Sequence, residues 1–164
     1  ALFCCFLRIN IHLQTIEGGC GAMNEYTLAE IEVGMKAVFH KTITKKMEDA
    51  FRVISGDENP LHKDDTFALE ISNGKFQGHA AFGMLTASLY STVAGMYLPG
   101  KYSLIHSFEE LSFTKPVFVG DDLTVEAEVT DKEIALKLIR LKVTIKNQDN
   151  KPVSKAKMKV LVMK

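Results

Sequence analysis

The sequence predicts an α+β domain with one long buried helix and an antiparallel β-sheet. The segment from Gly83 to Tyr97 is rich in apolar and small residues and has almost no charged face, which is typical of a buried helix. Residues 139–145 and 156–162 carry an apolar residue at every second position, which indicates half-buried strands. Turn residues at 120–122 and 148–150 mark the strand ends.

The other elements follow from the same patterns in chain order. Residues 36–43 read as a strand, with Ala37, Phe39 and Ile43 among the polar residues Lys36, His40 and Thr42. A helix of about three turns is then predicted behind Thr44, a good N-cap, and Gly56 ends it. Its apolar residues recur at helical spacing: Met47, Ala50, Phe51 and Ile54. After the long helix we expect strands over 102–114 and 123–129.

The loop after this first helix contains the best candidates for chemistry. Asp57 and His62 are five residues apart, with Gly56 before the pair and Pro60 inside it. Asn59 followed by Pro60 predicts an N-cap and the first residue of a short helix, which places His62 in the first turn on backbone of fixed direction. A carboxylate and an imidazole held in this way can converge on one small molecule such as water, so we predict an acid/base pair.

Composition excludes several classes of function. The 164 residues fit one domain, and 46% hydrophobic with 24% charged residues is ordinary for a globular protein. The formal net charge is zero and no basic run stands out, which argues against a nucleic-acid or anionic-membrane partner. No stretch is long enough to span a bilayer.

Residues 1–22 differ from the rest and hold all three cysteines: Cys4, Cys5 and Cys20. The apolar run at 2–7 is short and follows no basic region, which argues against a signal peptide. We therefore expect residues 1–22 to be a leader or an added segment outside the fold, and residues 23–164 to be a single domain. A cysteine-free domain indicates a reducing, cytoplasmic setting.

The loop also carries a family resemblance. Residues 56–62 read Gly-Asp-Glu-Asn-Pro-Leu-His, which resembles the Gly-Asp-x-Asn-Pro-[aliphatic]-His signature of the MaoC-like, (R)-specific enoyl-CoA hydratases. The similarity extends from about Leu28 to the C-terminus and includes residues 31–36, 82–89 and 113–121. It implies a hot-dog fold, a long central helix wrapped by an antiparallel sheet, as a homodimer or a higher homo-oligomer.

The resemblance also assigns roles to residues. It implies that Asp57 and His62 are catalytic and add water reversibly to a trans-2-enoyl thioester, carried by coenzyme A or acyl carrier protein, with no other cofactor. It implies that the backbone of Gly83 binds the thioester carbonyl and that Ser91 faces the acyl tunnel. Helix N-termini suit a carbonyl that gains negative charge, and glycine allows its close approach. Asn59 would support the loop.

One position departs from the family pattern. The central helix there usually opens His-Gly-Met, whereas this chain has Phe82-Gly83-Met84, and the nearest histidine upstream is His79. This departure bears on substrate range and on the support of the helix N-terminus. His79 could reach the site. A metal cluster of His62, Asp64, Asp65 and His79 is a further alternative, although its spacing fits no zinc signature.

Two rival functions remain at this level. A hot-dog thioesterase or a synthase-type dehydratase usually places its essential carboxylate on the central helix, and residues 82–98 contain no Asp or Glu. A non-catalytic acyl-thioester-binding protein would bind the same ligand without reaction, and only the Phe82 departure supports it.

Overall fold

The computed structural model describes residues 14–16 and 22–164, so the three cysteines lie outside the described part. Its sheet has six strands in the order β1-β2-β4-β5-β6-β3. Four of the pairings are antiparallel, and only the short β1 runs parallel to its neighbour β2. The strands are β1 Gln14–Ile16, β2 Lys36–Thr42, β3 Ser103–Phe113, β4 Asp122–Glu133, β5 Leu138–Lys146 and β6 Pro152–Val162.

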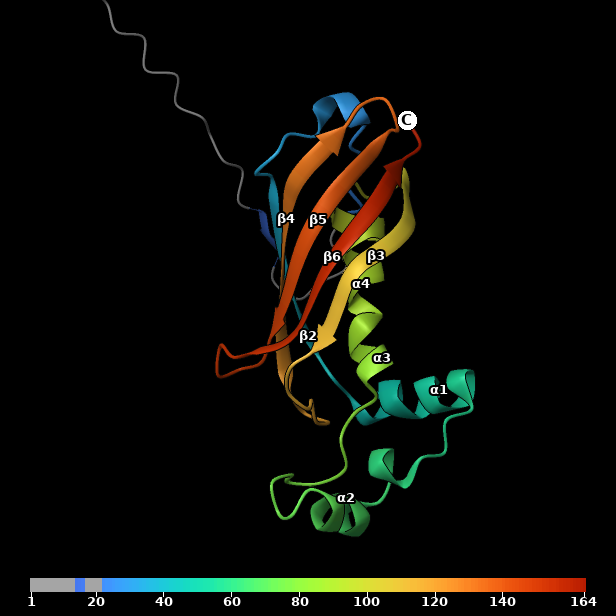
Figure 1. The fold of residues 1–164 in the computed structure, drawn as a ribbon, viewed down its shortest axis with the longest axis vertical. Coiled ribbons are helices and arrows are strands. Elements are labelled where there is room, and N and C mark those ends of the chain that lie inside the picture. Colours follow the sequence, from blue (N-terminus) through green and yellow to red (C-terminus); the bar gives the residue numbers. More distant parts are fainter. Residues whose placement is uncertain (1–13, 17–21) are drawn as a thin grey trace, which may run out of the picture.

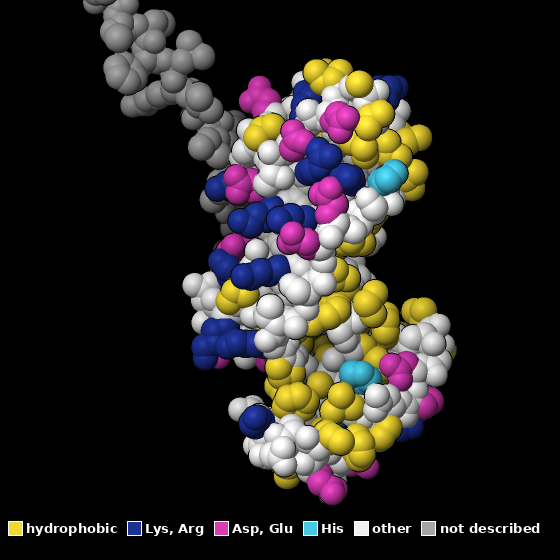
Figure 2. All heavy atoms as spheres, viewed as in Figure 1, with side chains coloured by type: hydrophobic (Ala, Val, Ile, Leu, Met, Phe, Trp, Pro, Cys, Tyr) yellow, Lys and Arg dark blue, Asp and Glu magenta, His cyan; other side chains and the backbone are white. Residues whose placement is uncertain are grey.

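The alternating pattern of the strands decides which face covers the core. In β5 and β6 the predicted apolar residues are buried, and polar and charged residues alternate with them. Figure 2 shows basic and acidic side chains next to one another over the outer face of the sheet. In these two strands burial therefore follows the period of two that the sequence predicts.

The long helix lies against the inner face of the sheet (Figure 1). It comprises three consecutive segments, α3 Gly83–Ala87, α4 Leu89–Thr92 and a π-helical turn Val93–Tyr97, so the predicted bounds are confirmed. Its buried residues join those of the strands in one hydrophobic core. Tyr90, which is fully buried, satisfies its hydroxyl with a 2.6 Å hydrogen bond to Ser154 of β6.

A small lobe extends beyond one end of the sheet (Figure 1). It contains α1 Lys45–Ser55, a 3-10 turn Pro60–His62 and α2 Asp65–Ile71, while another 3-10 turn, Leu28–Glu30, precedes β2. Thr44 caps α1 as predicted, because its hydroxyl accepts the Met47 N–H at 3.3 Å. None of the helices in the described ranges is long and apolar enough to cross a membrane.

The structure differs from the sequence predictions in α1 and near the N-terminus. The apolar spacing in α1 predicted the helix, but Ala50 is exposed and Ile54 is 81% exposed, whereas the charged Glu48 is fully buried. Gln14–Ile16 pair with β2, although residues 1–22 were expected to stand outside the fold. Residues 1–13 and 17–21 lie outside the described part, and the domain boundary at residue 22 stays a prediction.

Candidate active site

Asp57 stands at the end of α1, where the chain turns sharply. Gly56 adopts a φ of +68°, a left-handed conformation that glycine adopts without a Cβ penalty, and its N–H closes the helix on Arg52. The Asp57 N–H donates to the Ser55 hydroxyl at 3.2 Å, and Asp57 Oδ1 accepts the Asn59 N–H at 2.9 Å. The carboxylate is exposed, and within the described residues its Oδ2 has no hydrogen-bond partner.

Asn59 and Pro60 build the short turn that holds His62. Asn59 Oδ1 accepts the Leu61 N–H at 3.0 Å, and the Asn59 carbonyl accepts the His62 N–H at 3.0 Å. Pro60 is the first residue of the turn. A backbone N–H at this position would have no partner within the helix, so proline, which lacks one, loses no hydrogen bond. The predicted cap is present, and the loop between the two candidate groups is fixed at both ends.

The imidazole of His62 is oriented by one hydrogen bond and one ring contact. Its Nδ1 lies 2.7 Å from the carbonyl oxygen of Ala80. Because a carbonyl only accepts, Nδ1 carries the hydrogen, and Nε2 of the neutral ring is left with a lone pair. The ring lies on Phe82 with centroids 4.2 Å apart, and Phe82 in turn contacts Phe51 at 5.3 Å.

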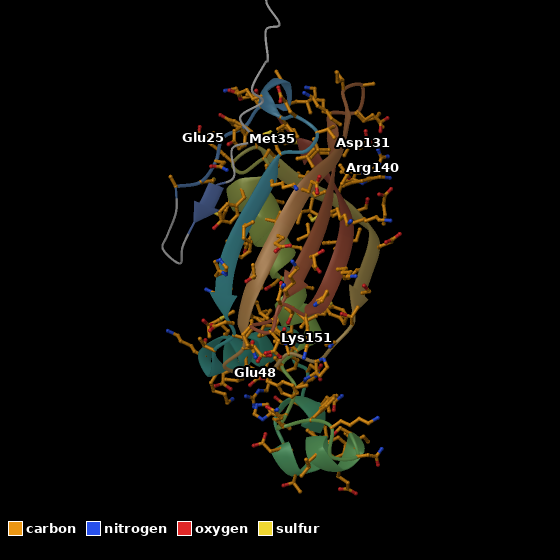
Figure 3. All side chains as sticks on the ribbon, turned by 90° about the vertical axis from the view of Figure 1, so that its left-hand side faces the viewer. Glu25, Met35, Glu48, Asp131, Arg140 and Lys151 are labelled. Atoms are coloured by element: carbon orange, nitrogen blue, oxygen red, sulfur yellow. The ribbon has the colours of Figure 1, made fainter. Side chains whose placement is uncertain are left out.

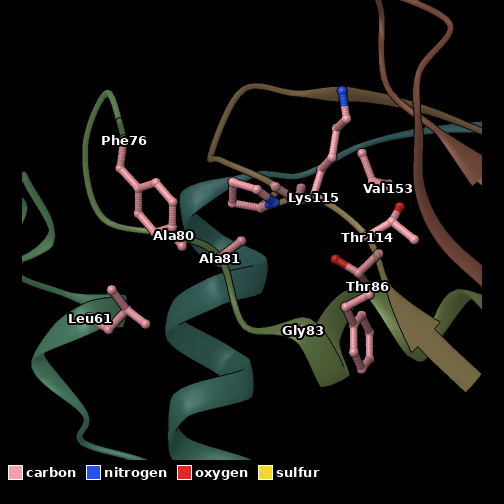
Figure 4. A pocket seen from close by; sticks show the side chains of 12 residues that line it. Leu61, Phe76, Ala80, Ala81, Gly83, Thr86, Thr114, Lys115 and Val153 are labelled. Atoms are coloured by element: carbon pink, nitrogen blue, oxygen red, sulfur yellow. The ribbon is translucent and has the colours of Figure 1, made fainter. Parts of the chain in front are cut away.

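A cavity of about 320 Å³ opens beside this arrangement (Figure 4). Leu61, Ala80 and Gly83 line it, so it adjoins the residue before His62, the carbonyl that orients His62 and the first residue of α3. The first N–H groups of a helix have no partner within the helix. A Cβ added to Gly83 would lie 3.5 Å from the Phe113 ring, an ordinary van der Waals distance, so the packing here does not itself require glycine.

The predicted site residues are only partly brought together. His62 and Gly83 are linked through Ala80 and the cavity. No hydrogen bond joins Asp57 to His62 within the described residues, and neither of them lines the cavity. Ser91 is exposed on α4 and does not line this cavity.

Two residues that the sequence did not place in the site belong to its surroundings. Thr86, one turn after Gly83, lines the cavity, and its buried hydroxyl has no hydrogen-bond partner in the described chain. Phe82, which the sequence showed only as a departure from the family pattern, is 2% exposed and packs against the His62 ring. For Thr86, the only signal in the sequence was that a threonine stands within an apolar helix.

His79 does not enter the cavity lining but binds two carboxylates, Asp65 and Glu48. Burial lowers the pKa of His79, but hydrogen bonds and charge from Asp65 and Glu48 outweigh it and raise the pKa above its ordinary value. In the described part of the chain, no group of three or more His, Cys, Asp or Glu residues is arranged to hold a metal ion.

The sequence of this chain is similar to those of one protein family and of several characterised enzymes. Residues 27–151 match the MaoC like domain. The chain is 44% identical over 115 residues to an (R)-specific enoyl-CoA hydratase of Aeromonas caviae, covering 68% of this chain and 83% of that protein. It is 34% identical over 102 residues to a 3-hydroxybutyryl-CoA dehydratase of Methylorubrum extorquens, covering 62% of each chain.

The solved structures agree with the sequence comparison. An unliganded R-hydratase from Pseudomonas aeruginosa matches with a TM-score of 0.76 at 33% identity, covering 86% of this chain and 87% of that one. The expected hot-dog fold, with a central helix wrapped by an antiparallel sheet, is thereby confirmed.

Proposed function

Because the chain belongs to the MaoC-like domain family, we propose that it adds water reversibly to trans-2-enoyl thioesters, with Asp57 and His62 as the catalytic pair. It is a hydro-lyase, an enoyl-CoA hydratase and 3-hydroxyacyl-CoA dehydratase, and the name of the Aeromonas relative supports (R) stereochemistry for the hydroxyl product. The observation that carries the site assignment is the fixed His62 ring, whose free Nε2 belongs to the same loop as the free Oδ2 of Asp57.

Water addition then proceeds by two proton transfers. A water molecule held between Asp57 Oδ2 and His62 attacks C3, and Asp57 accepts a proton from that water as the C–O bond forms. In this direction His62 acts as the imidazolium: it carries a second proton on Nε2, besides the Nδ1–H bonded to Ala80, and supplies that second proton to C2. Transfer of the proton from Asp57 to His62 afterwards restores the starting charges. In the dehydration direction neutral Nε2 removes the C2 proton, and Asp57 protonates the departing hydroxide.

The cavity accounts for stabilisation of the intermediate charge. Protonation at C2 follows build-up of negative charge on the thioester oxygen, which needs a donor that is already in place. The first N–H groups of α3, which have no partner within the helix and begin at the cavity-lining Gly83, supply one. Asn59 supports the loop through its two hydrogen bonds. Acid–base chemistry of this kind needs no cofactor beyond the coenzyme A or acyl carrier protein that carries the substrate.

The surface supports a homodimer. β3 is an edge strand of the sheet, and it exposes four large apolar side chains: Leu104, Phe108, Leu111 and Phe113. Figure 2 shows hydrophobic side chains gathered on this side of the molecule. An apolar edge strand is a template for a second chain, so two copies that meet here would cover it. Ser91, exposed on the same protomer, would then face an acyl tunnel completed by the partner. The absence of cysteine from residues 23–164 supports a cytoplasmic location.

The test is the loss of the conjugated-thioester absorbance of crotonyl-CoA. We expect the wild-type protein to remove the band, and Asp57→Asn and His62→Gln to slow the loss by about 10²- to 10⁴-fold each. Glu58→Gln is the matched control, because Glu58 is an exposed carboxylate of the same loop that pairs with Lys63 at 2.7 Å. Equal activity of Asp57→Asn and Glu58→Gln would overturn the assignment.

A further inference from the structure

A buried charge lies close to the candidate site but takes no part in the proposed reaction. Among the described residues, Glu48 is the only charged residue that is buried, with an exposed fraction of 0%, and its Oε1 has no hydrogen-bond partner. Figure 3 places Glu48 on α1, between the end of the sheet and α2. A carboxylate in this position is costly unless a cation is held beside it.

His79 is one such cation, and its ring contacts two carboxylates, Glu48 and Asp65. Its Nε2 lies 3.2 Å from Glu48 Oε2, and its Nδ1 and backbone N–H both contact Asp65 Oδ1, the latter at 2.8 Å. Ionised carboxylates only accept, so a ring with a carboxylate at each nitrogen is satisfied as the imidazolium, which donates from both. Lys45, whose Nζ lies 3.8 Å from Glu48 Oε2, is the other charged group against this cluster.

The cluster connects the elements that carry the site. Glu48 belongs to α1, which leads into Gly56 and Asp57, and Asp65 begins α2, three residues after His62. His79 precedes Ala80, whose carbonyl receives the His62 Nδ1–H at 2.7 Å and whose N–H donates to Leu61 at 3.0 Å. A displacement of His79 therefore moves the acceptor that orients the His62 ring.

We propose that His79, held as an imidazolium between Glu48 and Asp65, is a positioning residue that fixes the Ala80 carbonyl and thereby the tautomer and direction of His62. The consequence for catalysis rests on the proposed function, whereas the effect on His62 does not. His79 touches neither the cavity nor the reacting atoms, so its loss lowers the rate of the chemical step more than substrate binding.

Two variants and a matched control test the proposal. His79→Gln removes the cation, and Glu48→Gln keeps the side-chain shape but removes the buried charge. His40→Gln is the control, because His40 is an exposed histidine on β2 whose ring hydrogen-bonds Thr124, away from the His79 cluster. The first readout is the ¹⁵N shift of the His62 ring nitrogens, which reports the tautomer without any substrate. Thermal unfolding shows which variants are folded.

We expect folded His79→Gln to convert His62 from the Nδ1–H form to a mixture of tautomers, while His40→Gln leaves it unchanged. For crotonyl-CoA hydration, we expect kcat to fall by about 10- to 100-fold, the scale of a small misplacement of a catalytic group, with KM changed less than about threefold. Should His79→Gln not fold, Glu48→Gln carries the test, with a smaller effect in the same direction.

Unchanged His62 shifts in the folded variants would overturn the proposal, as would a kcat within twofold of wild type. The two proposals fail separately. A wild-type protein that does not hydrate crotonyl-CoA contradicts the proposed function, and the ¹⁵N measurement still decides whether His79 positions His62.

Discussion

Phe82→Ala removes the ring on which His62 lies, at the position where the chain departs from its family. The ring is 2% exposed and contacts His62 on one side and Phe51 on the other, with centroid distances of 4.2 and 5.3 Å. Truncating a buried phenylalanine costs about 3–5 kcal/mol in free energy of unfolding, which includes the contacts between the rings. Loss of the ring also frees the imidazole to tilt about its remaining hydrogen bond to Ala80.

We therefore expect two separate effects. Urea unfolding at fixed protein concentration should show Phe82→Ala destabilised by about 3–5 kcal/mol, and Phe82→Leu by less than about 2 kcal/mol because most of the apolar volume is retained. Under conditions in which Phe82→Ala is folded, kcat for crotonyl-CoA should fall by about 10- to 100-fold. A loss below about 1 kcal/mol, or a folded Phe82→Ala with wild-type kcat, would refute the reasoning.

Four further predictions follow from single features. Gly56→Ala places a Cβ at φ +68° and should lower the free energy of unfolding by about 1–2 kcal/mol in urea titration; no loss would contradict the turn assignment. Thr86→Val removes an unpaired buried hydroxyl and should raise the free energy of unfolding by about 1 kcal/mol, whereas a decrease would mean that the hydroxyl has a partner. The raised pKa of His79 means that its contribution to stability is complete below about pH 6.5, its unfolded value, and declines as pH rises through the higher folded value; His79→Gln should abolish that decline. Leu104→Lys, on exposed β3, should convert a dimer to a monomer in sedimentation velocity, and an unchanged dimer would place the interface elsewhere.

Sequence periodicity was sufficient where one face of an element is buried and the other is not. The helix over 83–97 and the strands β5 and β6 followed from their apolar patterns, because the burial pattern repeats with the backbone period, although β6 begins at Pro152, before the predicted start at 156. The caps at Thr44 and Asn59 were also readable, because a cap is a contact between residues two or three apart.

Contacts between distant segments were not readable in this way. Glu48 is fully buried in α1, and its Oε2 lies 3.2 Å from Nε2 of His79, 31 residues later, while Ile54 of the same helix is exposed. The partner of the His62 Nδ1–H, the Ala80 carbonyl, is a backbone atom 18 residues away and leaves no trace in side-chain identity. The loop motif therefore identified the candidate pair, and only the structure showed what orients it.

The most direct test of the central claim, water addition by Asp57 and His62, is an NMR measurement of the product that the protein makes from crotonyl-CoA in D₂O. We predict 3-hydroxybutyryl-CoA with one deuterium at C2, formed by the wild type and lost in Asp57→Asn. Free coenzyme A thiol would instead indicate a thioesterase, and unchanged crotonyl-CoA that nevertheless binds would indicate a non-catalytic acyl-thioester-binding protein; either result would contradict the account.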